Sequence, residues 1–369
     1  MKHYLTLAIA IVIACTNSYA QFFGFGGFQA PEITAQFSEK FTDINYAGDN
    51  EVYHTLDVYL PKHTADKYPV VVHIYGSAWF SNSSKGMADI NTICKALLEA
   101  GYAVVCPNHR SSMDAKWPAQ INDIKAVVRF LRAKADKFHL DPSFIGMSGF
   151  SSGAHLASFM ATTNDVKIAK QGDAEYDIEG KLGIFTNEKS YVNACVEWSG
   201  PIDLLHMDCD GVAKDPNSPE VALMGFGKEG NTDKFLMLNP NNFLDSQDVP
   251  IGIFHGLKDN VVPECQGSLF HDQLKAAGIK TFLVEQPEGG HGFNMYSDKN
   301  LGAAVGFLNK VRKDVKENDM SRQNPIVQTW FTTDPAPIVQ LSPITTPGRI
   351  VVLPPIQQRL PITTGRAHS

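Results

Sequence analysis

The sequence has no cluster of lysine and arginine residues and no long run of like charge. Its 32 basic and 39 acidic residues give a formal net charge of −7, spread over 369 residues. Nucleic-acid binding needs concentrated positive charge that can contact phosphates, so we expect no nucleic-acid partner. The hydrophobic content of 43% and the charged content of 19% are typical of a globular chain that buries a large core.

Cysteine pairs with metal-binding spacing are also absent. None of the six cysteines belongs to a Cys-x-x-Cys pair, so neither a zinc site nor a redox dithiol of that kind is encoded, and we expect no metal. Cys94, Cys106 and Cys195 lie in apolar periodic segments, which predicts small core residues. Cys209 and Cys265 lie in or near loops, and whether they pair in an oxidising compartment is left open.

The one uninterrupted apolar run at the amino end, over residues 4–14, is too short to span a bilayer as a helix. It follows Lys2 and precedes the small residues before Gln21, so we predict a signal peptide over residues 1–20 and a secreted or periplasmic protein. Alternatively, Val12-Ile13-Ala14-Cys15 fits the lipobox of bacterial lipoproteins, which would give a membrane-anchored lipoprotein with a lipid on Cys15.

Apolar periodicity predicts strands that alternate with helices over residues 40–317. We therefore expect an α/β fold, a three-layer sandwich whose mostly parallel central sheet carries helices on both faces. Predicted strands cover residues 52–60, 68–75, 102–106, 192–198, 250–254 and 281–285, with another just before Gly149. Predicted helices follow Gly86, open at Trp117-Pro118, and cover residues 264–277 and 301–315.

Three segments differ in composition from this pattern. Residues 21–39, rich in Phe, Gly and Gln, are predicted to form an N-terminal arm, and the loop-rich residues of about 200–245 a cap-like insert. Residues 318–369 are predicted to be a linker or an unstructured tail. From Ala336 onward that tail contains six prolines and neither an acidic residue nor a lysine.

Ser151 lies in Gly149-Phe150-Ser151-Ser152-Gly153, between an apolar strand and small or apolar residues that open a helix. This G-x-S-x-G pattern predicts a nucleophile elbow, in which the two glycines permit a sharp turn that exposes the serine. The motif is short enough to occur by chance. Its interpretation therefore depends on partners elsewhere in the chain.

An acid and a histidine should follow the nucleophile, each on a loop that leaves a strand. Asp259 follows the strand 250–254, and His291 follows the strand 281–285 within Gly289-Gly290-His291-Gly292. A neutral serine needs a histidine to accept its proton, and a carboxylate orients that histidine. We predict Ser151, His291 and Asp259 as a catalytic triad, with Asp203 as the alternative acid and His255 as the alternative base.

Acyl transfer also needs donors for an oxyanion. We predict the backbone N–H groups of Ser152, Ser77 and Ala78, the last two in the small-residue loop Tyr75-Gly76-Ser77-Ala78-Trp79. This loop keeps one glycine of the H-G-G-G motif of lipases and esterases. Aromatic residues near the site either contact substrate or belong to the core. The candidates for substrate contact are Trp79, Phe150, Trp198 and Phe293.

Several stretches carry a family resemblance beyond the elbow: residues 56–61, 75–79, 118–132, 145–157, 199–203, 218–220, 255–263 and 290–292. On these, the chain resembles the bacterial feruloyl and acetylxylan esterase group of the α/β-hydrolases, related to the hormone-sensitive-lipase-like esterases. The resemblance implies a secreted serine ester hydrolase that acts on plant cell-wall polysaccharide such as xylan, without a cofactor and without an obligate protein partner. Alternatives are a general short-chain carboxylesterase, a prolyl-oligopeptidase-like peptidase domain, and a non-catalytic carbohydrate-binding relative.

A second resemblance lies in the tail. Residues 324–339, Asn-Pro-Ile-Val-Gln-Thr-Trp-Phe-Thr-Thr-Asp-Pro-Ala-Pro-Ile-Val, resemble the opening of a glycoside hydrolase family 43 module, whose general base would correspond to Asp334. About thirty residues cannot form the rest of such a module, so we expect Asp334 to be inert. We hypothesise that the chain derives from an esterase joined to a hemicellulase, cut or shifted in frame near Gln340.

Overall fold

The structure is a computed structural model, and it describes residues 33–85, 89–212, 215–323 and 349–352. The chain divides into two compact units, residues 1–34 and 35–369, and everything below concerns the second. The predicted signal peptide 1–20, Cys15 and the family 43-like residues 324–339 lie outside the described residues. No helix in the described part of the chain is both long and apolar enough to cross a bilayer.

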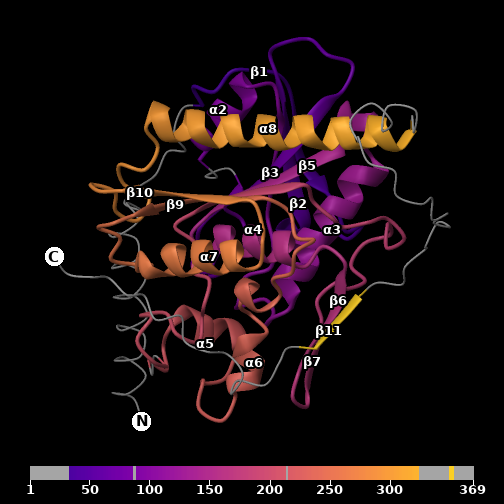
Figure 1. The fold of residues 1–369 in the computed structure, drawn as a ribbon. Coiled ribbons are helices and arrows are strands. Elements are labelled where there is room, and N and C mark those ends of the chain that lie inside the picture. Colours follow the sequence, from indigo (N-terminus) through magenta and orange to yellow (C-terminus); the bar gives the residue numbers. More distant parts are fainter. Residues whose placement is uncertain (1–32, 86–88, 213–214, 324–348, 353–369) are drawn as a thin grey trace, which may run out of the picture. The chain divides into compact units, whose positions relative to one another are not determined.

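An eight-stranded sheet forms the centre of the larger unit (Figure 1). Its strand order is β1-β2-β4-β3-β5-β8-β9-β10, and all pairs are parallel except β1–β2 and β2–β4. The strands are β1 (Phe37–Asn45), β2 (Thr55–Pro61), β3 (Tyr68–Ile74), β4 (Ala103–Pro107), β5 (Leu140–Phe150), β8 (Ala194–Trp198), β9 (Ile251–Gly256) and β10 (Thr281–Gln286). The predicted mostly parallel sheet is thus confirmed.

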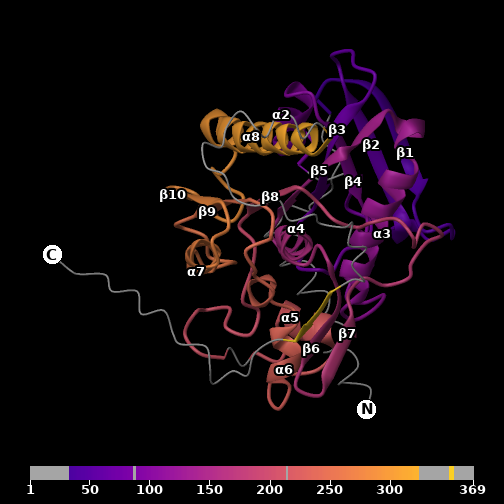
Figure 2. The same ribbon diagram turned by 45° about the vertical axis from the view of Figure 1, so that its right-hand side comes forward.

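Helices cover both faces of this sheet, as the alternating pattern predicts (Figures 1 and 2). On one face lie α2 (Ile93–Glu99) and α8 (Asp298–Gln323), and on the other lie α3 (Ala119–Ala133), α4 (Ser152–Thr162) and α7 (Cys265–Ala276). Parallel strands joined by crossover helices end at a common edge of the sheet, where a site is expected. The loops after β3, β5, β9 and β10 all leave from that edge.

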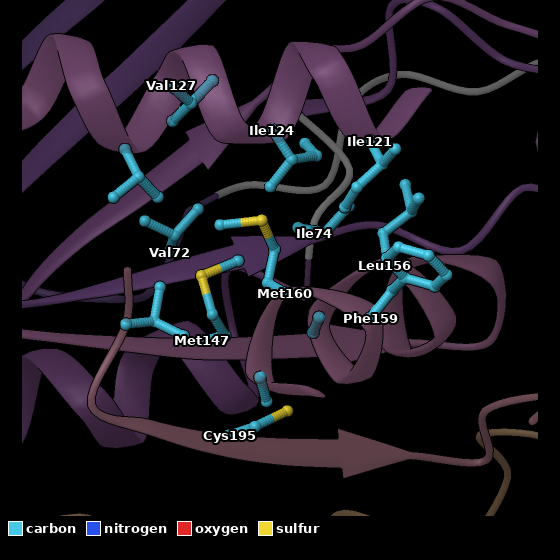
Figure 3. Close-up of a cluster of buried hydrophobic side chains, with 14 of the residues drawn as sticks. Val72, Ile74, Ile121, Ile124, Val127, Met147, Leu156, Phe159, Met160 and Cys195 are labelled. Carbon is cyan, nitrogen blue, oxygen red and sulfur yellow. The ribbon is translucent and has the colours of Figure 1, made fainter. Parts of the chain in front are cut away.

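Each face of the sheet has its own buried apolar layer because strand side chains alternate between the faces. On β3, Val70 and Val72 pack toward α3 and α4, whereas Val71 belongs to the layer beneath α2 and α8. Figure 3 shows the first layer, where residues of α3 and α4 interdigitate over the strands. Its labelled members are Val72, Ile74, Ile121, Ile124, Val127, Met147, Leu156, Phe159, Met160 and Cys195.

A smaller group of elements lies beyond α4 and α7 (Figures 1 and 2). It contains α5 (Pro219–Met224), α6 (Thr232–Leu236), the 3-10 turn η4 (Pro240–Asn242) and the three-stranded sheet β11-β6-β7. The two short helices lie in the predicted cap-like insert of about 200–245. The hairpin β6 (Val166–Gln171) and β7 (Ala174–Asp177) was not predicted, because its short strands alternate irregularly between polar and apolar residues.

Both predicted boundaries of the main domain need correction. β1 begins at Phe37, inside the predicted arm 21–39, and pairs with β2 as an edge strand whose mixed polarity hides it. At the other end α8 continues to Gln323, past the predicted limit at residue 317, because residues 316–323 contain no helix breaker. Within the predicted unstructured tail, Arg349–Val352 form β11, which pairs in parallel with β6.

The cysteines divide as the sequence indicates. Cys94, Cys106 and Cys195 are buried thiols, and the Sγ atoms of Cys94 and Cys106 lie 3.9 Å apart. Cys209 and Cys265 form a disulfide across a sequence separation of 56 residues, which joins the loop after β8 to the first residue of α7. The pairing that the sequence left open is therefore present. This crosslink restricts the unfolded chain somewhat more than a local one would, because the entropy of loop closure grows slowly with loop length.

We expect the double substitution Cys209→Ser/Cys265→Ser to lower the free energy of unfolding by about 2–4 kcal/mol, because the unfolded chain regains the entropy of a large loop. Denaturant unfolding measures this change. A thiol reductant should destabilise the wild-type protein similarly and leave the double variant unchanged. Equal unfolding free energies for wild type and variant would contradict the expectation.

Candidate active site

Ser151 occupies the sharp turn between β5 and α4. Its φ is 55°, and its N–H donates to the carbonyl of Trp198 at 2.9 Å. The turn needs its two glycines: a Cβ on Gly149 would lie 2.2 Å from the Gly153 carbonyl oxygen, and one on Gly153 would lie 2.1 Å from the Ile74 carbonyl oxygen. No other residue type fits such approaches, so the G-x-S-x-G pattern forms the predicted elbow.

Three predicted residues converge at the strand ends. The Ser151 Oγ lies 2.9 Å from His291 Nε2, and His291 Nδ1 lies 2.8 Å from Asp259 Oδ2. With the imidazole neutral, the Ser151 hydroxyl donates to Nε2 and the Nδ1–H donates to Asp259. The structure thus brings together the serine, histidine and acid predicted from their order in the chain.

Asp259 is held as an anion in a buried place. Its side chain is fully buried, which raises its pKa, but the hydrogen bond and charge of His291 and two backbone amides act in the opposite direction. These amides are the N–H groups of Val261 and Val262, both 2.9 Å from Oδ1. The pKa of Asp259 is lowered overall, so the carboxylate stays ionised and fixes the imidazole orientation.

The alternative acid and base have other partners. Asp203 Oδ2 lies 2.9 Å from His206 Nδ1, and Asp203 Oδ1 accepts a bond from the Asn239 amide at 2.7 Å. His255 is buried, its Nε2 lies 2.9 Å from the Val262 carbonyl, and burial lowers its pKa. Neither side chain is hydrogen-bonded to Ser151 or His291 in the described structure. His255 instead supports the loop that carries Asp259.

The predicted oxyanion donors do not all remain available. The Ser77 N–H donates to the Ser152 hydroxyl at 2.9 Å, so its assignment as a free donor is corrected. Of the three predicted donors, the N–H groups of Ala78 and Ser152 remain. Ala78 and Trp79 have φ values of 50° and 60°, and this left-handed pair turns the loop sharply over the elbow.

Ser152 therefore contributes more than its backbone. Its hydroxyl ties the loop after β3 to the first turn of α4, a role that sequence reasoning missed. Ser152 is 1% exposed, so this bond is shielded from water. The only sequence signal for this role was the position of Ser152 directly after Ser151. The sequence alone did not show that the loop after β3 lies beside it.

The four candidate aromatics divide between core and surface. Trp198 is fully buried and stacks on Phe254 with ring centroids 4.1 Å apart, and Trp79 is 3% exposed and packs edge-on against His155. Both are core residues, so their predicted substrate contact is corrected. Phe150 packs against the His291 ring, with centroids 4.7 Å apart. Phe293, two residues after His291, is 72% exposed.

Within the residues that the structure describes, no group of three or more His, Cys, Asp or Glu side chains is placed to hold a metal ion.

The chain is similar to several known esterases. The BD-FAE family matches residues 56–274. A solved structure described as a truncated form of carbohydrate esterase from gut microbiota is 42% identical, with a TM-score of 0.74, and the match covers 75% of this chain and 98% of that chain. A bifunctional GH43-CE protein of Bacteroides eggerthii is 45% identical, with a TM-score of 0.72, over 74% of this chain and 35% of that chain.

Curated relatives are more distant. The esterase LipQ of Mycobacterium tuberculosis is 26% identical over 263 residues, which is 70% of this chain and 59% of the relative. The chain spans 59%, 62% and 50% of the first three curated relatives that it matches. With the matched residues covering more than half of the sequence and including Ser151 and Asp259, the chain belongs to the BD-FAE family of α/β-hydrolase esterases.

Proposed function

We propose that this protein is a serine carboxylic ester hydrolase that removes feruloyl or acetyl groups from a plant cell-wall polysaccharide such as xylan. The observation that carries the proposal is the continuous hydrogen-bonded series from Ser151 Oγ through His291 to Asp259. Such a series activates a serine for attack on a carbonyl carbon. The carbohydrate substrate is supported by the 42% identity to a protein described as a carbohydrate esterase.

In the proposed acylation step, Ser151 Oγ attacks the ester carbonyl while His291 Nε2 takes the hydroxyl proton. Asp259 stays ionised and stabilises the imidazolium that forms, in keeping with its lowered pKa. The tetrahedral oxyanion accepts hydrogen bonds from the Ala78 and Ser152 N–H groups. His291 then gives its proton to the leaving alcohol oxygen, and the acyl group remains on Ser151.

Deacylation uses the same groups in reverse. A water molecule gives a proton to His291 Nε2 as its oxygen attacks the acyl-serine carbonyl, and the same amides bind the second oxyanion. The C–O bond to Ser151 then breaks, its oxygen takes the proton back from His291, and the carboxylic acid leaves. Every proton moves through one imidazole whose ring Phe150 and Asp259 hold in place.

We assign recognition of the acyl group to exposed residues on the two catalytic loops rather than to the buried aromatic residues. Phe293 lies on the loop that carries His291, and Val261 and Leu257 lie on the loop that carries Asp259; their exposed fractions are 72%, 36% and 43%. Apolar side chains exposed beside a reactive centre can cover an aromatic ring or a sugar face. Phe293 is therefore the proposed contact for a feruloyl ring.

The rival functions differ in measurable ways. A prolyl-oligopeptidase-like domain would cleave a peptide anilide, and a general short-chain carboxylesterase would prefer p-nitrophenyl acetate to esterified xylan. A non-catalytic relative would bind insoluble xylan without turnover. The intact hydrogen-bonded trio favours turnover over mere binding.

We also propose that the protein is exported. A signal peptide over residues 1–20 implies a secreted or periplasmic protein, and the alternative is a lipoprotein anchored through Cys15. Mass spectrometry of the exported amino terminus distinguishes Gln21 from a lipidated Cys15.

Similarity to a bifunctional GH43-CE protein supports the hypothesis of an esterase joined to a family 43 module. Genomic sequence downstream that lacks a glycosidase-like reading frame would refute it.

Substitution of the proposed nucleophile tests the mechanism. Ser151→Ala should lower kcat for p-nitrophenyl acetate by about 10⁴-fold or more, because no group replaces the attacking oxygen. Circular dichroism should show an unchanged fold, since the small side chain keeps the turn. Retained ester hydrolysis in the folded variant would refute the assignment.

The tie between Ser152 and Ser77 gives a second prediction. Ser152→Ala keeps the backbone donor but removes the acceptor that fixes the Ser77 N–H, so the loop carrying Ala78 should lose its position. We expect kcat to fall about tenfold with little change in KM. Ser77→Ala, which keeps its N–H, is the matched control and should behave like wild type. Equal kcat values for the two variants would contradict this role.

The acyl group is tested by product analysis on feruloylated and acetylated arabinoxylan. If Phe293 covers the feruloyl ring, Phe293→Ala should raise KM for the feruloyl ester about tenfold and change KM for the acetyl ester little. Ile184→Ala is the matched control, because Ile184 is 77% exposed but lies between β7 and β8 rather than on a catalytic loop. No release of either acid would overturn the proposed substrate.

A further inference from the structure

Glu197 is a carboxylic acid in the middle of the sheet that the proposed mechanism does not use. It lies on β8, where its register partners are Gly149 on β5 and Ile253 on β9. β5 carries Ser151 at its end, and β9 carries the loop of Asp259. Glu197 therefore lies on the strand between the nucleophile strand and the acid strand.

Its environment provides few hydrogen bonds. The side chain is fully buried, and Oε2 accepts the Gly200 N–H at 2.8 Å. Among the described residues Oε1 has no hydrogen-bond partner. The Gly200 backbone also packs closely against this carboxyl group. A Cβ on Gly200 would lie 2.8 Å from Oε2 and 2.9 Å from the Ala154 Cβ, so no larger residue fits at position 200. A buried carboxylate with one donor is poorly compensated, which favours the neutral acid.

The charged groups around Glu197 act in the same direction. Burial raises the pKa of Glu197 most, the Gly200 amide lowers it and the negative charge of Asp259 raises it, and together they raise it to about 8. The titratable groups that interact with it electrostatically are Asp259 and, on its own strand, Cys195. His255 lies two residues beyond its register partner Ile253 on β9, and the neighbouring Gly149 and Ala154 carry no titratable group. Burial lowers the pKa of His255 and raises that of Cys195, so both are neutral near pH 7. No cation faces this carboxyl within the described structure.

We propose that Glu197 is a positioning residue for the esterase reaction, and that its neutral form keeps Asp259 as the only anion beneath His291. The inference rests on the proposed function of Ser151, His291 and Asp259. Glu197 holds the Gly200 turn against the first turn of α4 while adding no charge to the site. Ionised Glu197 disrupts this arrangement.

The consequence of ionisation follows from the packing. A second buried anion repels the Asp259 carboxylate. The Glu197 carboxyl is closely packed on the side of the Gly200 turn, where a Cβ on Gly200 would lie 2.8 Å from Oε2. We therefore expect the repulsion to move β8 or the Asp259 loop. Displacement of a catalytic group by about 1 Å is enough to lower a rate by two orders of magnitude. Turnover should therefore be lost as Glu197 ionises.

The test is the pH dependence of kcat/KM for p-nitrophenyl acetate in wild type, Glu197→Gln and Asp248→Asn. Gln keeps the acceptor for the Gly200 N–H but cannot ionise. Wild-type kcat/KM should fall about tenfold per pH unit above a midpoint near pH 8, and Glu197→Gln should keep its plateau at least one unit further. Burial raises the pKa of Asp248 to about 8 as well, but it precedes β9, at the opposite end from Asp259. Asp248→Asn should therefore show the same decline of kcat/KM above pH 8 as the wild type, called the alkaline limb below.

Stability gives an independent readout. Folded Glu197 keeps its proton up to about pH 8, whereas the unfolded residue loses it near pH 4.5, so folding stability from this group falls as pH rises through that window. The melting temperature of Glu197→Gln relative to wild type should rise over the same window. If Glu197→Gln does not fold, infrared spectroscopy of Asp248→Asn provides the test. In that variant one protonated carboxyl group should remain at pH 7. It should ionise at the pH at which kcat/KM falls to half of its plateau value.

The outcomes separate this inference from the proposed function. Absence of ester turnover in wild type at every pH would refute the proposed function itself. Wild-type turnover with the same alkaline limb in Glu197→Gln would leave the esterase intact and overturn the role of Glu197. Loss of the limb in Asp248→Asn, or absence of a protonated carboxyl in that variant at pH 7, would overturn it too.

Discussion

The structure depends on one close contact, between the start of α4 and the end of β3. Because Gly153 has no side chain, the backbone of the helix approaches the carbonyl of Ile74, and Ser151 is held at a φ of 55°. Such a conformation costs about 1–3 kcal/mol in an L-residue, and the surrounding sheet must maintain it. The N–H of Ser151 bonded to Trp198 and the hydroxyl of Ser152 bonded to Ser77 fix the turn to β8 and to the loop after β3. Nucleophile and oxyanion loop are thus positioned by the same contact.

The protonation states of the buried ionisable groups near the site are set by their surroundings. Asp259 is buried, yet two amides and His291 keep its pKa low, while burial without a cation raises the pKa of Glu197. Near neutral pH the carboxyl group of Asp259 is therefore ionised, whereas that of Glu197, on the neighbouring strand β8, is neutral. His255 remains neutral and bonds to the Val262 carbonyl, so it supports the Asp259 loop without competing for the role of His291.

Much of this was predictable from the sequence because the relevant signals are local. The parallel strands are near-continuous apolar runs, and Ser151, Asp259 and His291 each follow such a run on a glycine- or turn-rich loop. The missed elements lack that signal: β1 is an edge strand of mixed polarity, and the β6–β7 hairpin is short and polar. Trp198 was misassigned for a different reason, because no sequence pattern distinguishes an aromatic ring that faces the core from one that faces a site.

The difference between buried and exposed positions explains why the type of reaction was easier to predict than the ester substrate. Reaction chemistry needs groups held rigidly, so it lies on buried strand ends whose sequences are constrained by packing against α4 and the sheet. Recognition of the acyl group needs surfaces that remain open, and the residues proposed for it, such as Phe293 and Val261, are exposed loop residues. Their identity is not dictated by the fold. Two chains with this elbow and this triad can therefore share a mechanism and differ in substrate through a few exposed side chains.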